Sequence, residues 1–123
     1  MTEGRARVFE GSGGVLLIDS YRRGVDGTIC GVEMLDALVA LWNACRAGDW
    51  DRAYEIYFPV CATATLQMQG GLDGYIVSER YMLNRQGLFP NQVHRGPLSY
   101  ILDDETKREI DRLYDRLQET LRR

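Results

Sequence analysis

Lysine and histidine are almost absent from this sequence of 123 residues, which contains only Lys107 and His94. A lone histidine with no cysteine, histidine or acidic cluster at ligand spacing excludes the common metal-binding motifs, and no metal or cofactor is expected. The formal net charge of -3 and the sequence pI near 5.1 exclude the basic footprint of a nucleic-acid-binding protein.

Long hydrophobic runs are also missing. Residues 1–7 are polar, and the apolar stretch from Val15 to Ile18 is too short for a signal-peptide core or a membrane span. The sequence therefore predicts a cytoplasmic protein with no membrane partner. Its three cysteines, Cys30, Cys45 and Cys61, form no CxxC motif, so we expect free, buried thiols rather than disulfides.

The composition that remains, 45% hydrophobic and 27% charged, is typical of one globular unit. Its first thirty residues predict a strand at Ala6–Glu10, a tight glycine-rich turn at Gly11–Gly14, a helix at Val15–Arg23 and a second strand at Val25–Cys30. A strand-helix-strand unit of this kind pairs its strands in parallel.

Helical patterns follow Gly31. We expect helices at Glu33–Ala47, at Trp50–Met68, at Tyr75–Arg85 and from Asp103 to the end of the chain. Pro59 removes a backbone donor, so the second run is either one bent helix or two helices that meet near Phe58. In the last helix, the core-facing side is predicted to carry Ile110, Leu113, Tyr114, Leu117 and Leu121.

Two parallel strands are an incomplete sheet, because parallel sheets are normally larger and are covered by helices on both faces. The unpaired edges need strands from a longer parent, from a complementing chain or from another copy of this chain. A homo-oligomer or a complex with a complementing chain is therefore expected.

The segments VFEGSGG (8–14), GVDGTICG (24–31) and CRAGDWDRAYEIYFP (45–59) resemble the dihydrodipicolinate synthase and N-acetylneuraminate lyase family. The resemblance extends over about Arg7 to Leu121. It implies an α/β fold that is the C-terminal part of a TIM (β/α)8 barrel. Residues 1–48 would supply the last two strand-helix units of the barrel, and residues 49–123 a helical C-terminal region.

The resemblance also implies a carbon-carbon lyase of the class I aldolase type, in which a lysine forms a Schiff base with a pyruvate-like keto acid that reacts with an aldehyde. In that family the lysine and a proton-shuttling tyrosine precede the matched region. Lys107 lies in a surface helix and is a poor substitute. We therefore expect no catalytic residue here, a chain that is inactive alone, and a partial substrate pocket lined by Gly11, Ser12 and Ile29.

Two other functions remain open. One is a non-catalytic oligomerisation or binding module. The other, which the sequence favours less, is a small phosphate- or nucleotide-binding domain that uses the turn at Gly11–Gly14, although the turn lacks the GxGxxG and P-loop patterns.

Several individual side chains have both a functional and a structural interpretation. Cys30 is interpreted as a packing thiol rather than a nucleophile, and His94 as a loop or interface residue. Glu33 and Asp36 are either carboxylates at a pocket rim or, as we prefer, acidic residues at a helix N-terminus. The remaining candidates are aromatic and basic residues of one helix that contact substrate or a neighbouring subunit, or simply pack: Tyr75, Arg80 and Tyr81.

Overall fold

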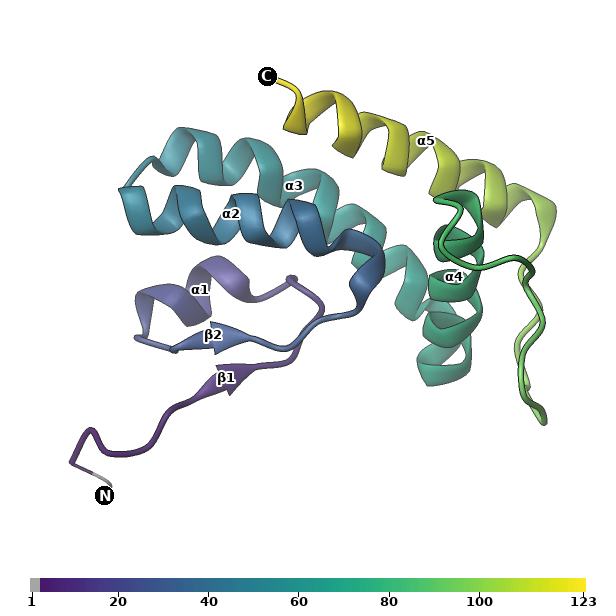
Figure 1. The fold of residues 1–123 in the computed structure, drawn as a ribbon, viewed down its shortest axis with the longest axis horizontal. Helices are drawn as coiled ribbons and strands as arrows, with labels where there is room; N and C mark the ends of the chain where they lie inside the picture. The colour runs from purple at the N-terminus through teal and green to yellow at the C-terminus, as the bar shows by residue number, and fades with distance from the viewer. Residues whose placement is uncertain (1–2) are drawn as a thin grey trace.

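The chain begins with two short parallel strands joined by a helix, in a computed structural model that describes residues 3–123 (Figure 1). β1 (Phe9–Glu10) pairs with β2 (Gly27–Thr28), with Phe9 opposite Gly27 and Glu10 opposite Thr28. The crossover helix α1 covers Leu17–Arg22. This confirms the predicted order and parallel pairing. The strands are shorter than predicted, because each has only one neighbour to pair with.

The rest of the chain is helical. Its elements are the short 3₁₀ helix η1 (Val32–Met34), α2 (Leu35–Ala47), α3 (Trp50–Gln67), the 3₁₀ helix η2 (Met68–Gly70), α4 (Gly71–Arg85) and α5 (Asp104–Leu121). Helices α2 and α3 run antiparallel, α5 packs on α3, and α1 lies between the strands and α2 (Figure 1). The described part of the chain is thus mostly helical with a two-stranded parallel sheet.

Helix ends follow local chemistry closely. Gly48 ends α2 with a left-handed φ of 72°, and the Asp49 side chain caps α3 by accepting a hydrogen bond from the Arg52 amide at 3.1 Å. Asp103 caps α5 in the same way through the Thr106 amide at 2.7 Å. The breaks predicted at these positions are confirmed.

Several helices differ from the prediction: α1 begins at Leu17 rather than Val15, and α2 begins at Leu35 after η1 rather than at Glu33. α3 is one helix through Pro59, so the alternative of two helices meeting near Phe58 is wrong. The Thr63 hydroxyl donates to the Pro59 carbonyl at 2.8 Å within this helix. α4 begins at Gly71 rather than Tyr75, because the positive φ of 63° at Gly71 makes the expected break and the helix resumes at once.

The core lies between the five helices α1 to α5. Its largest fully buried apolar side chains are Leu17, Leu41, Ile56, Val60, Met82, Ile110 and Leu117. On α5, Ile110 and Leu117 are buried as predicted, whereas Leu113, Tyr114 and Leu121 are only half-buried. No helix within residues 3–123 is both long and apolar enough to cross a membrane.

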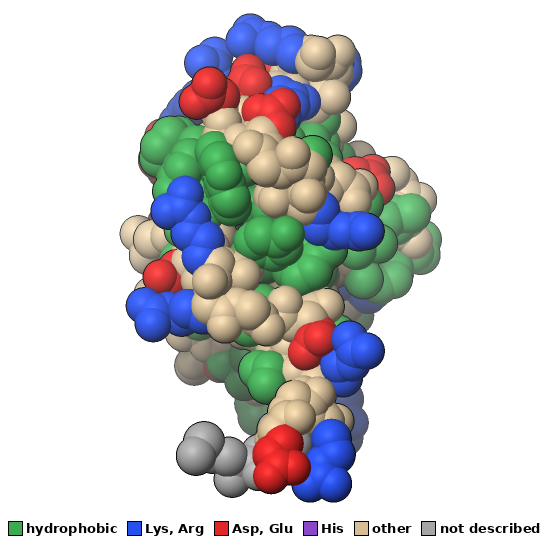
Figure 2. All heavy atoms as spheres, turned by 90° about the vertical axis from the view of Figure 1, so that its left-hand side faces the viewer, with side chains coloured by type: hydrophobic (Ala, Val, Ile, Leu, Met, Phe, Trp, Pro, Cys, Tyr) green, Lys and Arg blue, Asp and Glu red, His purple; other side chains and the backbone are tan. Residues whose placement is uncertain are grey.

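Large apolar side chains remain exposed beside the two strands. Val8 is 57% exposed, Phe9 54% and Ile29 70%. On the face drawn in Figure 2, apolar side chains gather around the middle of the molecule, with charged side chains among them and at both ends. The exposed side chains of Val8, Phe9 and Ile29 give the strand region an apolar surface that the described residues leave uncovered.

Substitutions of Gly14 and Gly24, which flank α1, can test how tightly the chain packs against the core at Gly14. Gly14 has a positive φ of 97°, and a Cβ atom there would lie 2.9 Å from Val60 Cγ1 and closer still to Leu38. Gly24 has a similar φ of 89° with open space around it. We expect Gly24→Ala to lower the free energy of unfolding by about 1 kcal/mol, from backbone strain alone. Gly14→Ala should cost about 1–3 kcal/mol more, from overpacking. Urea unfolding of both variants checks this, and equal losses would contradict the packing.

Candidate functional site

A pocket of about 320 Å3 lies at the carboxyl ends of the two strands. Gly11, Ser12 and Gly13 follow β1, and Ile29, Cys30 and Gly31 follow β2; the helical wall consists of Ala64, Met68, Leu72 and Tyr75. The structure thus brings together the three residues that the sequence predicted as pocket lining, Gly11, Ser12 and Ile29. Carboxyl ends of parallel strands are also where α/β proteins place their ligand sites.

The Glu10 carboxylate joins the two strand ends below this pocket. One oxygen accepts the Ser12 amide at 2.8 Å, and the other accepts the Thr28 hydroxyl at 2.6 Å. The Ser12 hydroxyl in turn accepts the Leu16 amide at 2.9 Å. Because these polar groups bond to one another, the turn at the pocket mouth is fixed in place.

The backbone hydrogen bonds after the turn Gly11–Gly14 indicate whether its amides are free to bind a phosphate. The amides of Val15 and Leu17 donate to the carbonyls of Ser12 and Gly14, at 3.3 and 3.1 Å, and so point into the turn. α1 has only six residues and therefore a small dipole. This geometry favours the tight-turn interpretation of the glycines.

Tyr75 reaches the pocket from α4 and lies against Gly31. A Cβ atom on Gly31 would overlap both the Tyr75 hydroxyl and the Glu33 carboxylate, so a larger residue there would displace these two groups. The Tyr75 hydroxyl donates to Glu33 Oε1 at 3.2 Å, and Gln67 Nε2 donates to the same oxygen at 3.0 Å. Burial and the neighbouring Glu33 charge raise the pKa of Tyr75, so it is a neutral phenol at physiological pH.

Glu33 is the buried centre of this cluster, with only 3% of its surface exposed. Its Oε2 atom has no donor among the described residues unless the neighbouring Glu79 carboxyl holds a proton. Burial, and then the charge and hydrogen bond of Glu33, raise the pKa of Glu79 above its ordinary value. The neutral form of the Glu79 carboxyl is therefore favoured beside Glu33.

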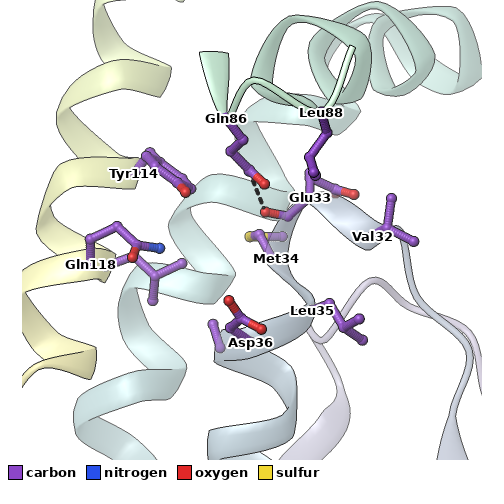
Figure 3. A pocket seen from close by; sticks show the side chains of 11 residues that line it. Val32, Glu33, Met34, Leu35, Asp36, Gln86, Leu88, Tyr114 and Gln118 are labelled. Carbon is purple, nitrogen blue, oxygen red and sulfur yellow. Dashed lines mark hydrogen bonds between the residues drawn. The ribbon is translucent and has the colours of Figure 1, made fainter. Parts of the chain in front are cut away.

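Glu33 and Asp36 occupy different environments, although both lie in the first turn of a helix as expected. Asp36 is exposed and borders a separate hollow of about 210 Å3 between α2, the end of α4 and α5 (Figure 3). There the Gln86 side chain donates to the Glu33 carbonyl at 2.8 Å (Figure 3). The Glu33 carboxylate, by contrast, is a structural centre and not only a helix-terminal charge.

The nucleophile candidates are poorly suited to that role. Cys30 lines the pocket but is only half-buried, contrary to the prediction, as is Cys61; all three cysteines are free. Burial, followed by the charges of Glu33 and Glu10, raises the pKa of the Cys30 thiol, which keeps it protonated. Lys107 pairs with Asp104 at 3.3 Å on α5, a helix that contributes nothing to this pocket.

Metal ligands do not gather within residues 3–123, where no group of three His, Cys, Asp or Glu side chains is placed to hold an ion. His94 lies in the segment between α4 and α5, as expected. The residues that sequence reasoning missed are Gln67 and Glu79, the partners of Glu33. The sequence offered one signal for this cluster. Gln67 lies on the apolar side of a helix, and a buried amide requires a hydrogen-bond partner.

The raised pKa of Glu79 leads to a prediction for Glu79→Gln. Because the pKa of Glu79 is raised in the folded protein, the stability from its neutral form is complete below the ordinary value of 4.5 and is lost as pH rises through the folded pKa. The Gln amide stays neutral and can donate to Glu33. The free energy of unfolding of Glu79→Gln should therefore rise relative to the unmodified chain as pH increases above 4.5.

Urea unfolding at several pH values between 4 and 8 measures this difference. Glu119→Gln, at an exposed position of α5, serves as the control and should show little pH-dependent difference. A difference for Glu79→Gln that stays constant with pH would contradict a raised pKa of Glu79.

Comparison with solved structures finds a similar protein. The crystal structure of dihydrodipicolinate synthase from Rhodopseudomonas palustris superposes with a TM-score of 0.80 and 27% sequence identity over 93% of this chain. The chain spans 37% of that synthase. No family model matches the sequence, and no curated protein matches it. The predicted resemblance to the C-terminal portion of this enzyme family is confirmed.

Proposed function

We propose that this chain is the C-terminal segment of a lyase of the dihydrodipicolinate synthase type, supplying the last two strands of a TIM barrel and the helices that follow. The observation that carries the proposal is the similarity of 93% of the chain to 37% of a dihydrodipicolinate synthase. The pocket at the carboxyl ends of β1 and β2 supports it, because TIM-barrel enzymes have their active sites at that end of the strands.

In the proposed enzyme this segment builds one wall of the substrate pocket. Gly11, Ser12 and Ile29 line the side formed by the strand ends, and Met68 and Leu72 add an apolar side that excludes water. The Schiff-base lysine and the proton-shuttling tyrosine come from the rest of the barrel, so the segment is inactive alone. The substrates are a pyruvate-like keto acid and an aldehyde.

The partner in this proposal is a polypeptide that completes the sheet, or a second copy of the chain. The open strand edges and the exposed side chains of Val8, Phe9 and Ile29 support such a partner. The same apolar surface also supports the second candidate function, a non-catalytic oligomerisation module, which needs no lysine.

Schiff-base trapping tests the enzymatic proposal. The chain is expressed alone and together with the polypeptide encoded directly upstream of it, and both preparations are treated with pyruvate and borohydride. Intact-mass spectrometry should then detect a reduced pyruvate adduct on the upstream polypeptide only. Lys107→Arg serves as the control and should leave the labelling unchanged.

Two outcomes would overturn these roles. An adduct at Lys107 of the isolated chain would show that this lysine is reactive. A stable complex that gives no adduct with pyruvate would favour the assembly module.

A further inference from the structure

A second cavity, of about 370 Å3, lies one helical turn further along α4 than Tyr75. It opens between α4 and residues 89–98, and it shares no lining residue with the pocket at the strand ends. Its basic side chains are Arg80 from α4 and His94 and Arg95 from the segment that follows α4. Two guanidinium groups and an imidazole thus converge on one concave surface.

Arg80 is held in place without an ionic partner. Its guanidinium carbon lies 4.0 Å from the centre of the Phe89 ring, and its Nη2 donates to Asn91 Oδ1 at 3.2 Å. Its Nε atom is buried and has no hydrogen-bond partner among residues 3–123. In that part of the chain, no carboxylate forms an ion pair with Arg80 or Arg95.

Arg85, further along the same helix, has carboxylate partners. It pairs with Asp111 at 3.0 Å and with Asp115 at 2.7 Å, and it also stacks on Tyr114. The half-buried Arg80 also stacks on an aromatic ring but lacks the carboxylate partners that Arg85 has. An immobilised guanidinium of this kind offers its remaining N–H groups to an anion.

Glu79 is the one acidic residue of the cavity lining, and it does not neutralise the arginines. Its carboxyl group interacts with the Val32 amide and with Glu33. Burial and the charge of Glu33 raise the pKa of Glu79, which favours its neutral form. The cavity therefore keeps a positive character.

The remaining lining is apolar and includes Ile76, Leu83 and Leu98. A site with a few charged groups and an otherwise apolar wall fits a ligand that has both characters. We propose that this cavity binds a small organic anion, a carboxylate or phosphate attached to an apolar group, whose charged end is held by Arg80 and Arg95. This inference is independent of the proposed lyase function.

Benzoate is a suitable probe, because it joins a carboxylate to an apolar ring, and benzamide is its neutral counterpart. Titration of the full chain at constant ionic strength, followed by NMR chemical shifts, should give saturable binding of benzoate and none of benzamide. Arg80→Gln and Arg95→Gln should each weaken benzoate binding about tenfold, the effect of one hydrogen bond to a charged group.

Arg108→Gln, at an exposed position of α5, is the matched control and should bind benzoate normally. Inorganic phosphate is added as a competitor: displacement of benzoate supports a phosphate-bearing ligand, and lack of displacement supports a carboxylate. Since Arg80→Gln also loses the contact with Phe89, circular dichroism must show that this variant is folded; if it is not, the exposed Arg95 decides the result.

The proposal is overturned if benzoate shows no saturable binding, or if benzamide binds as well as benzoate. It is also overturned if the folded glutamine variants bind benzoate as tightly as the unmodified chain.

Discussion

The junction between the strands and the helices depends on one buried carboxyl group, that of Glu33. Glu33 lies in η1, the short helix after β2, and its carboxyl group accepts hydrogen bonds from Gln67 at the end of α3 and from Tyr75 on α4. Its backbone carbonyl accepts Gln86 at the end of α4. A buried carboxylate is costly unless its oxygens are bonded, so the strand end and the two helices must keep their relative positions. The shape of the pocket beside Gly31 follows from this constraint.

The other side of that pocket is open for a different reason. Parallel strands obtain their pairing from neighbours on both sides, and here each strand has one neighbour. Hydrogen bonds such as those of Glu10 hold the strand ends together locally, but they do not cover the side chains of Phe9 or Ile29. The helices thus pack around a shared core, whereas each strand keeps one unpaired edge. This asymmetry is what a C-terminal segment of a barrel would have.

Local features of the structure were predictable from the sequence, and distant ones were not. Gly48, Asp49 and Asp103 fix helix ends through bonds to residues within a few positions, so their roles could be inferred from sequence alone. The Glu33 cluster joins residues 34 and 42 positions apart, which no periodicity reveals. The strand ends Gly11, Ser12 and Ile29 could be predicted to meet, because parallel pairing places them together.

Helix α4 links the two cavities because successive turns face different surroundings. Tyr75 faces the pocket at the strand ends, Glu79 meets Glu33, and Arg80 lines the second cavity. A fully charged Glu79 would oppose the charge of Glu33. Burial and that charge raise the pKa of Glu79, and its neutral form reduces the repulsion. One helix thus places a phenol in the first pocket and a guanidinium in the second.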